Sequence, residues 1–182
     1  MRTSDTEILV IPGLGGSGPD HWQSRWDSKL PTARRVIQAD WDRPRLDAWR
    51  GRIIEEVERA ELPVVFVAHS LGALAVVHAA PFLPEKVKGA FLVAPPSLES
   101  VGAIAEIDPA FVALPDTLLP FAALVIASRD DPYSSYADSE AFAQKFGAEL
   151  VDAGLSGHIN SESGHGPWPE GLMRFAGFLK GL

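Results

Sequence analysis

The sequence contains no cysteine among its 182 residues, which excludes a disulfide framework, a thiolate metal site and a cysteine nucleophile. It also has no long hydrophobic run: the longest, residues 118–127, contains Pro120 and is too short to span a bilayer. Positive charge is scarce, and the net charge of −8 argues against nucleic acid or a membrane surface as a partner. Because residues 1–7 are polar and lack the apolar core of a signal peptide, we expect a cytoplasmic protein.

Strand-like and helix-like segments alternate along the chain. Buried strands are expected at residues 8–11, 64–67, 89–94 and 122–127, with a weaker one at 34–39 and a last one at 149–152. Helices are expected at 19–30, 46–60, 73–80, 139–146 and 171–179, the first with its cap near Ser17 or Gly18. This alternation, in a chain of one-domain length, predicts a single domain over residues 1–182. We expect a three-layer α/β/α sandwich around a mainly parallel sheet of about six strands.

A serine stands where the most apolar strand gives way to a helix. Ser70 follows the run 64–67, and the small residues Ala68 and Gly72 flank it two positions away on either side. This strand–turn–helix setting is typical of the nucleophile elbow, G-x-S-x-G, with alanine in place of the first glycine. The alternative is that Ser70 only caps the helix that follows it.

Acidic and histidine residues follow two later strands directly. Asp130 and Asp131 come after residues 122–127, and His158 comes after residues 149–152. The carboxyl ends of parallel strands share one edge of a sheet, so these side chains are expected near Ser70, in the order of an α/β-hydrolase triad. Because both aspartates follow the strand closely, their positions do not show which of them is the triad acid. His158 is favoured over His165 because Gly157 lets the loop turn inward directly before it.

At this point the sequence resembles the small α/β-hydrolases of the retinoblastoma-binding-protein-9 and YdeN type, which are serine hydrolases. The motifs that carry the resemblance span the whole chain: Pro12-Gly13-Leu14-Gly15-Gly16, His21-Trp22, His69-Ser70-Leu71-Gly72, Asp130-Asp131-Pro132 and Gly157-His158-Ile159-Asn160. The segments 161–164 and 166–169 are closest to the bacterial branch. The resemblance implies an α/β-hydrolase fold without a large cap domain. It also implies Ser70 as nucleophile, His158 as base and Asp131, with Asp130 as the alternative, as the acid.

The expected chemistry is cleavage of a small-molecule ester, thioester or amide by acyl transfer through Ser70. His158 would accept the serine proton, and a carboxylate would fix the imidazole. We expect the backbone N–H groups of Leu71, directly after the nucleophile, and of Leu14, in the glycine-rich loop, to form the oxyanion hole. No grouping of metal ligands is present, and this chemistry requires neither a metal nor another cofactor.

The sequence is also compatible with two functions other than hydrolysis. The spacing Gly13-x-Gly15-x-x-Gly18 after a strand, with Asp40 further on, also fits a dinucleotide-binding oxidoreductase. It leaves Ser70 and His158 without a role, and Pro19 argues that the helix opens only after the last glycine. The other alternative is a non-catalytic protein-interaction domain on a hydrolase fold.

Several residues are candidates for the walls of the substrate site. His21 is expected near the active edge of the sheet, and Trp168 is expected to line the pocket after the histidine loop. His69 is expected to be structural or to line the pocket, and His78 to be a core residue. The segment 95–120 is too short for an enclosing cap, so we expect it to form one apolar wall of a cleft that prefers short acyl groups.

Overall fold

The computed structural model describes residues 1–182 and contains one six-stranded sheet, in which every pair of neighbouring strands is parallel. Its strands lie in the order β2-β1-β3-β4-β5-β6, so Ser70 follows one of the two central strands. Their bounds are β1 (Glu7–Ile11), β2 (Ala33–Arg35), β3 (Val64–His69), β4 (Val87–Val93), β5 (Ala122–Ala127) and β6 (Glu149–Asp152).

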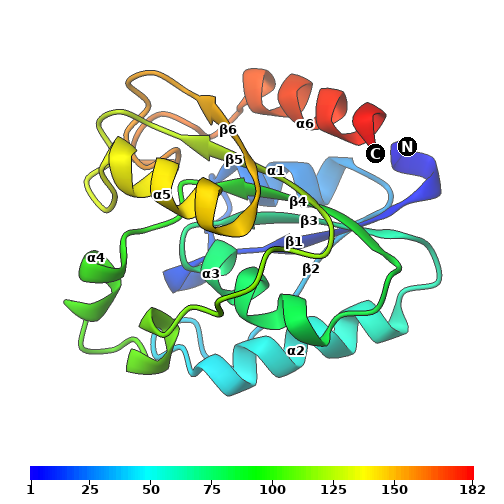
Figure 1. Cartoon of the computed structure of the whole chain (residues 1–182). Helices are drawn as coiled ribbons and strands as arrows, with labels where there is room; N and C mark the ends of the chain where they lie inside the picture. The colour runs from blue at the N-terminus through cyan, green and yellow to red at the C-terminus, as the bar shows by residue number, and fades with distance from the viewer.

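Helices cover both faces of this sheet (Figure 1). On one face lie α2 (Leu46–Arg59), α3 (Leu71–Ala79) and α5 (Tyr136–Phe146); on the other lie α1 (Trp22–Lys29) and α6 (Pro169–Gly181). Side chains of β3 alternate between the layers, with Phe66 in the core on the α3 side and Val67 in the core on the α1 side. The expected three-layer α/β/α sandwich with a parallel sheet is confirmed.

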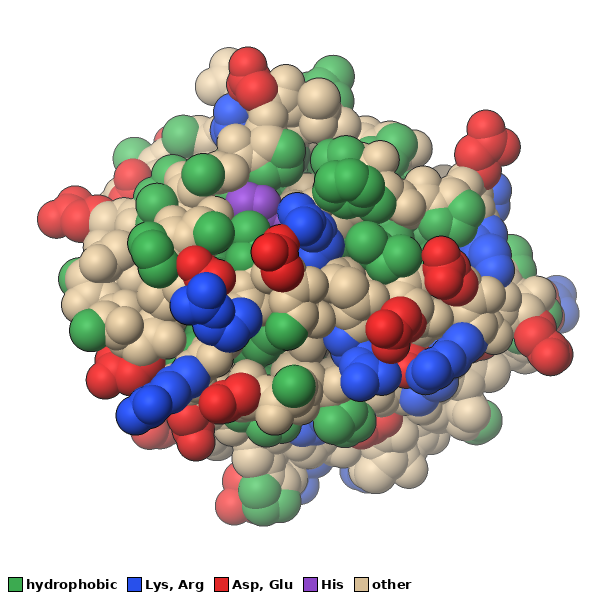
Figure 2. All heavy atoms as spheres, turned by 90° about the horizontal axis from the view of Figure 1, so that it is seen from below, with side chains coloured by type: hydrophobic (Ala, Val, Ile, Leu, Met, Phe, Trp, Pro, Cys, Tyr) green, Lys and Arg blue, Asp and Glu red, His purple; other side chains and the backbone are tan.

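In helix α2 the spacing of apolar residues along the sequence determines which face is buried. Helix α2 buries one stripe of apolar side chains, Leu46, Trp49, Ile53 and Val57, against the sheet and α3. Its other side carries ion pairs one turn apart, such as Arg52 with Glu55, and Figure 2 shows basic and acidic side chains interspersed over this underside of the molecule. No helix of the protein has the length and apolarity that crossing a membrane demands.

Four helix starts differ from the sequence prediction: α3 and α6 each begin two residues early, at Leu71 and Pro169, and α1 and α5 differ by three. Helix α1 begins at Trp22 rather than near Pro19, and its cap is His21, whose Nδ1 accepts the N–H of Gln23. Ser17 lies five residues before Trp22 and is not the cap; its hydroxyl donates to the side chain of Gln23. Helix α5 starts at Tyr136, before the predicted position, because Ser135 and Asp138 form a capping box. The edge strand β2 is also shorter than predicted.

Two glycines bring the loop after β1 against the start of α3. A Cβ at Gly72 would overlap the carbonyl oxygens of Ile11 and Pro12, so the first turn of α3 touches the end of β1 directly. A Cβ at Gly13 would lie 2.8 Å from the Cβ of Ser70. These two close approaches place the glycine-rich loop beside the serine turn.

Candidate active site

Ser70 occupies a turn that the backbone adopts only under constraint. Its φ of 54° and ψ of −127° lie in a region where residues other than glycine are strained, by about 1–3 kcal/mol. The Ser70 N–H donates to the carbonyl of Val93 on the neighbouring strand, at 2.9 Å. Although Ser70 stands at the N-cap position of α3, its side chain makes no capping hydrogen bond. The hydroxyl is therefore free to project from the edge of the sheet.

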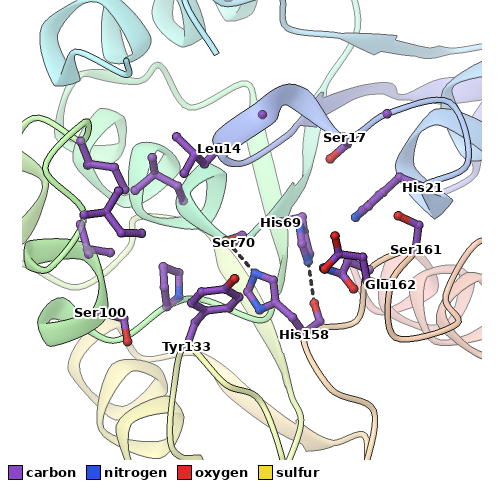
Figure 3. A pocket seen from close by; sticks show the side chains of 18 residues that line it. Leu14, Ser17, His21, His69, Ser70, Ser100, Tyr133, His158, Ser161 and Glu162 are labelled. Atoms are coloured by element: carbon purple, nitrogen blue, oxygen red, sulfur yellow. Dashed lines mark hydrogen bonds between the residues drawn. The ribbon is translucent and has the colours of Figure 1, made fainter. Parts of the chain in front are cut away.

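The Ser70 hydroxyl lies beside a histidine from the loop after β6, and a carboxylate from the loop after β5 lies next to that histidine (Figure 3). Ser70 Oγ donates to Nε2 of His158 at 2.9 Å. Nδ1–H of the same ring donates to both carboxylate oxygens of Asp131, at 3.0 and 2.9 Å. The side chains of His158 and Asp131 are only 9% and 2% exposed. The three residues thus form one hydrogen-bonded chain, largely shielded from water.

The neighbouring candidates have other partners. The Asp130 carboxylate accepts hydrogen bonds from the hydroxyl of Ser128 (2.7 Å) and the N–H of Gly157 (2.8 Å), which hold its pKa below the ordinary value. Asp130 therefore supports the turn directly before His158 and does not contact the imidazole. His165 pairs with Ser163, at 3.2 Å, rather than with Ser70.

The loop that carries His158 is fixed by donors from distant parts of the chain. Nε2–H of His69 donates to the carbonyl of His158 (2.9 Å), and the indole N–H of Trp22 donates to the carbonyl of Ile159 (2.8 Å). Ile159 is fully buried and has a φ of 48°, an unusual conformation for a β-branched residue. This role of Trp22 is not predictable from the sequence, because only the fold brings its indole to the loop.

Tyr133 is a second residue that the sequence analysis missed. Its backbone N–H donates to Oδ1 of Asp131 at 2.9 Å, and its ring lies edge-on to the ring of His158, with 4.6 Å between centroids. Its position two residues after Asp131, beyond Pro132, was the available signal. Tyr133 thus helps to orient both the carboxylate and the imidazole.

A cavity of about 300 Å³ opens at Ser70 and has two unlike ends. Val101, Ile104 and Ile107, from the segment after β4, form an apolar wall at one end, as expected for that segment. His21, Ser161 and Glu162 lie on one side of Ser70, and Ser100, from the same segment as the apolar wall, lies on the other (Figure 3). Ser161 and Glu162 are exposed at the rim.

Trp168 does not line this cavity, so that expectation is wrong. Its side chain is 6% exposed and packs in the core against Trp22 and Trp26, with ring centroids 5.0 and 5.9 Å away. A Cβ at Gly171 would overlap the indole, which therefore lies back over the first turn of its own helix. His21 does line the cavity, as expected, and so does His69, whereas His78 is buried elsewhere and bonded to Phe111.

Burial keeps His21 and His69 uncharged. Desolvation, and then the charges of Arg35, His158 and His165, lower the pKa of His21 from 6.5 to about 4. Nδ1 of His21 accepts the N–H of Gln23, so the neutral ring carries its proton on Nε2, which has no partner within the protein. An unsatisfied buried donor costs about 1–3 kcal/mol. Burial also lowers the pKa of His69 well below 6.5.

The glycine-rich loop does not have the form that a dinucleotide site requires. Gly18 lies outside α1, which begins only at Trp22, so no helix N-terminus follows the glycines directly. The carboxylate of Asp40 accepts the N–H groups of Asp42 and Arg43, both at 2.9 Å, and so stabilises its own turn. Leu14 is 40% exposed and its loop forms part of the cavity wall.

A parallel sheet with a strained serine at the end of a central strand, bonded to a histidine from a later loop, defines an α/β-hydrolase. The model of the serine hydrolase family matches residues 8–177, and the chain belongs to this family. It is similar to a YdeN-like hydrolase from Pectobacterium atrosepticum, with 35% identity over 97% of this chain and 91% of the other (TM-score 0.86). The protein is therefore an enzyme of the hydrolase class.

More distant structures share the fold. The YdeN gene product of B. subtilis is 21% identical over 96% of this chain and 99% of its own, with a TM-score of 0.81. Thermogutta terrifontis esterase 2, in a structure phosphonylated by cyclosarin, is 15% identical over 98% of this chain and 84% of its own (TM-score 0.71). Among curated proteins, no sequence matches this chain.

The buried histidines predict a stability that falls in mild acid. In the unfolded chain His21 titrates near 6.5, whereas in the folded protein its pKa is about 4. Between these values the unfolded state binds more protons, so the free energy of unfolding decreases as the pH falls through this window. His69 contributes with the same sign. Urea unfolding between about pH 7 and about pH 4 measures the slope. His21→Asn, which keeps a capping acceptor, should make it shallower; an unchanged slope would contradict the assignment.

Proposed function

We propose that this hydrolase cleaves a small ester, thioester or amide by acyl transfer through Ser70, with His158 as general base and acid and Asp131 as its carboxylate partner. The observation that supports this is the continuous hydrogen-bonded chain from Ser70 Oγ through His158 to Asp131. The strained backbone of Ser70 and the cavity beside its hydroxyl support the same assignment.

The reaction takes place in two halves. Ser70 Oγ attacks the carbonyl carbon while its proton passes to Nε2 of His158, and the carbonyl electron pair moves onto oxygen. When the tetrahedral intermediate collapses, the bond to the leaving group breaks and His158 returns the proton to the leaving atom. Water then attacks the acyl-enzyme with the same assistance, which releases the acid and restores Ser70. Asp131 keeps the proton of His158 on Nδ1 throughout and stabilises the imidazolium.

The backbone N–H groups of Leu71 and Leu14 are the proposed oxyanion donors. Leu71 is the first residue of α3, so its N–H has no acceptor within the helix and lies at the positive end of the helix dipole. A Cβ at Gly13 would lie 3.1 Å from the nitrogen of Leu71, a measure of how closely the Leu14 loop approaches. Loss of one such donor typically lowers the rate by about 10²–10³-fold.

Covalent labelling tests the nucleophile directly. A tagged fluorophosphonate should attach to Ser70, because His158 activates only this hydroxyl, and Ser70→Ala should abolish the label. An esterase of the same fold is phosphonylated by an organophosphorus agent, which makes this class of probe suitable. Ser28→Ala, at an exposed position on α1, is the matched control and should label normally. Label that persists in Ser70→Ala would refute the proposal.

The two aspartates are distinguished by a pair of variants. Asp131→Asn should lower kcat by about 10⁴-fold, because the amide no longer holds the proton of His158 on Nδ1. Asp130→Asn should lose less than about tenfold, since an amide oxygen can still accept from Ser128 or Gly157. Hydrolysis of a p-nitrophenyl ester by the two folded variants decides between them. The reverse ranking would make Asp130 the acid.

The apolar wall predicts a preference for short acyl groups. Each methylene buried against Val101, Ile104 and Ile107 should contribute about 0.8 kcal/mol, but only as far as this short wall extends. We therefore expect kcat/KM across p-nitrophenyl esters to be highest for acetyl or butyryl and to fall for long chains. A maximum at dodecanoyl or beyond would indicate a deeper pocket.

A further inference from the structure

The two ends of the cavity must receive different parts of the substrate. The hydrocarbon of an acyl group suits the wall of Val101, Ile104 and Ile107. The leaving atom must lie within reach of Nε2 of His158, which returns the proton to it. Residues 158–162 form one loop, and this loop continues from His158 into the polar end of the cavity. With the acyl hydrocarbon on the apolar wall, the space left for the leaving group is the polar end, beside His21, Ser161 and Glu162.

At this polar end, two side-chain nitrogens have no hydrogen-bond partner within the protein. His21 is 95% buried, being 5% exposed, and its ring points into the cavity toward His69 and Glu162 (Figure 3). Its Nε2–H is a donor without a partner in the protein. His69 donates its Nε2–H to the carbonyl of His158, so its Nδ1 is an unprotonated acceptor. The two rings are adjacent, with 4.7 Å between centroids.

We propose that His21 and His69 bind a hydroxyl group on the leaving alcohol, so that the substrate is an ester of a polyhydroxylated alcohol such as a glycol or glycerol. The hydroxyl oxygen accepts from Nε2–H of His21, and its proton is donated to Nδ1 of His69. A methyl group in the same place can do neither and leaves the buried donor unpaired. This inference rests on the proposed function, because it takes Ser70 and His158 as the reacting groups.

Capping of α1 does not account for the free nitrogen. The cap uses only Nδ1 of His21, as acceptor for Gln23, and serine, asparagine or aspartate commonly serve this purpose without a ring. An imidazole adds a second nitrogen on the far side of the ring, and this ring lines the cavity. His21 is thus proposed as a specificity-determining residue in addition to its structural role.

Two variants separate these roles. In His21→Asn the side-chain oxygen takes the place of Nδ1, so the cap is kept and the distant donor is lost. In His21→Gln the amide NH₂ reaches about the place of Nε2, so the donor is kept and the cap is lost. Thermal unfolding reports the cap: Tm should stay near wild type in His21→Asn and fall in His21→Gln.

The substrates are an isosteric pair of butyrates, 2-hydroxyethyl butyrate and propyl butyrate. They have the same acyl group and differ only by OH against CH₃ at the end of the leaving group. The wild-type ratio of kcat/KM, hydroxyethyl over propyl, should be about tenfold. It should fall to the ratio set by the intrinsic reactivities of the two esters in His21→Asn and stay near wild type in His21→Gln. Because the intrinsic reactivities of the two esters are the same for every variant, changes in the ratio report on His21 alone.

The outcomes also separate this inference from the proposed function. An equal ratio in wild type and His21→Asn, with fluorophosphonate still attached to Ser70, overturns the role of His21 and leaves the nucleophile intact. Labelling of Ser70 without hydrolysis of either butyrate overturns the inference in the same way. Absence of both labelling and hydrolysis overturns the proposed function, and the inference with it.

Discussion

The hydrogen bond between Ser70 and His158 depends on two stretches of main chain that are held in unfavourable conformations. Ser70 and Ile159 both have positive φ, of 54° and 48°, and neither is glycine. Such conformations persist only where surrounding contacts fix them. Val93 fixes the first by accepting the N–H of Ser70, and the donors of His69 and Trp22 fix the second through the carbonyls of residues 158 and 159. The burial of β3 and β4 stabilises the whole arrangement.

The first turn of α1 connects the parts of the site. Three consecutive residues act there: His21 faces the cavity, Trp22 holds the histidine loop, and Gln23 donates to the carbonyls of Ile11 and Val67. The last two contacts join this turn to the ends of β1 and β3. A single helix start therefore sets the relative positions of the glycine-rich loop, the serine turn and His158. The role of α1 is mainly to position these groups, and its packing on the sheet provides the rigidity.

The sequence was sufficient wherever a local pattern determines the structure. The apolar runs predicted β3 and β5, the spacing of Leu46, Trp49, Ile53 and Val57 predicted the buried face of α2, and strand ends predicted which loops meet. It was insufficient where a distant partner decides. Asp130 and Asp131 look alike in sequence, and only their partners in the fold distinguish them: Asp130 accepts from Ser128 and Gly157, whereas Asp131 accepts from His158. Trp168 is buried because Trp22 and Trp26 provide a surface for it, which no local pattern reveals.

Ser70 and His158 follow strands that differ in burial, and this difference affects how the site comes apart when the protein is heated. Ser70 follows β3, which is buried along its whole length, whereas His158 follows β6, a four-residue strand at the sheet edge that pairs only with β5. Edge elements with few buried contacts open at a lower free energy than the centre of a fold. Fraying of β6 would withdraw His158 from Ser70 while the turn that carries Ser70 stays intact. Separation of His158 from Ser70 and loss of the folded core are then two distinct events, and the first requires less free energy.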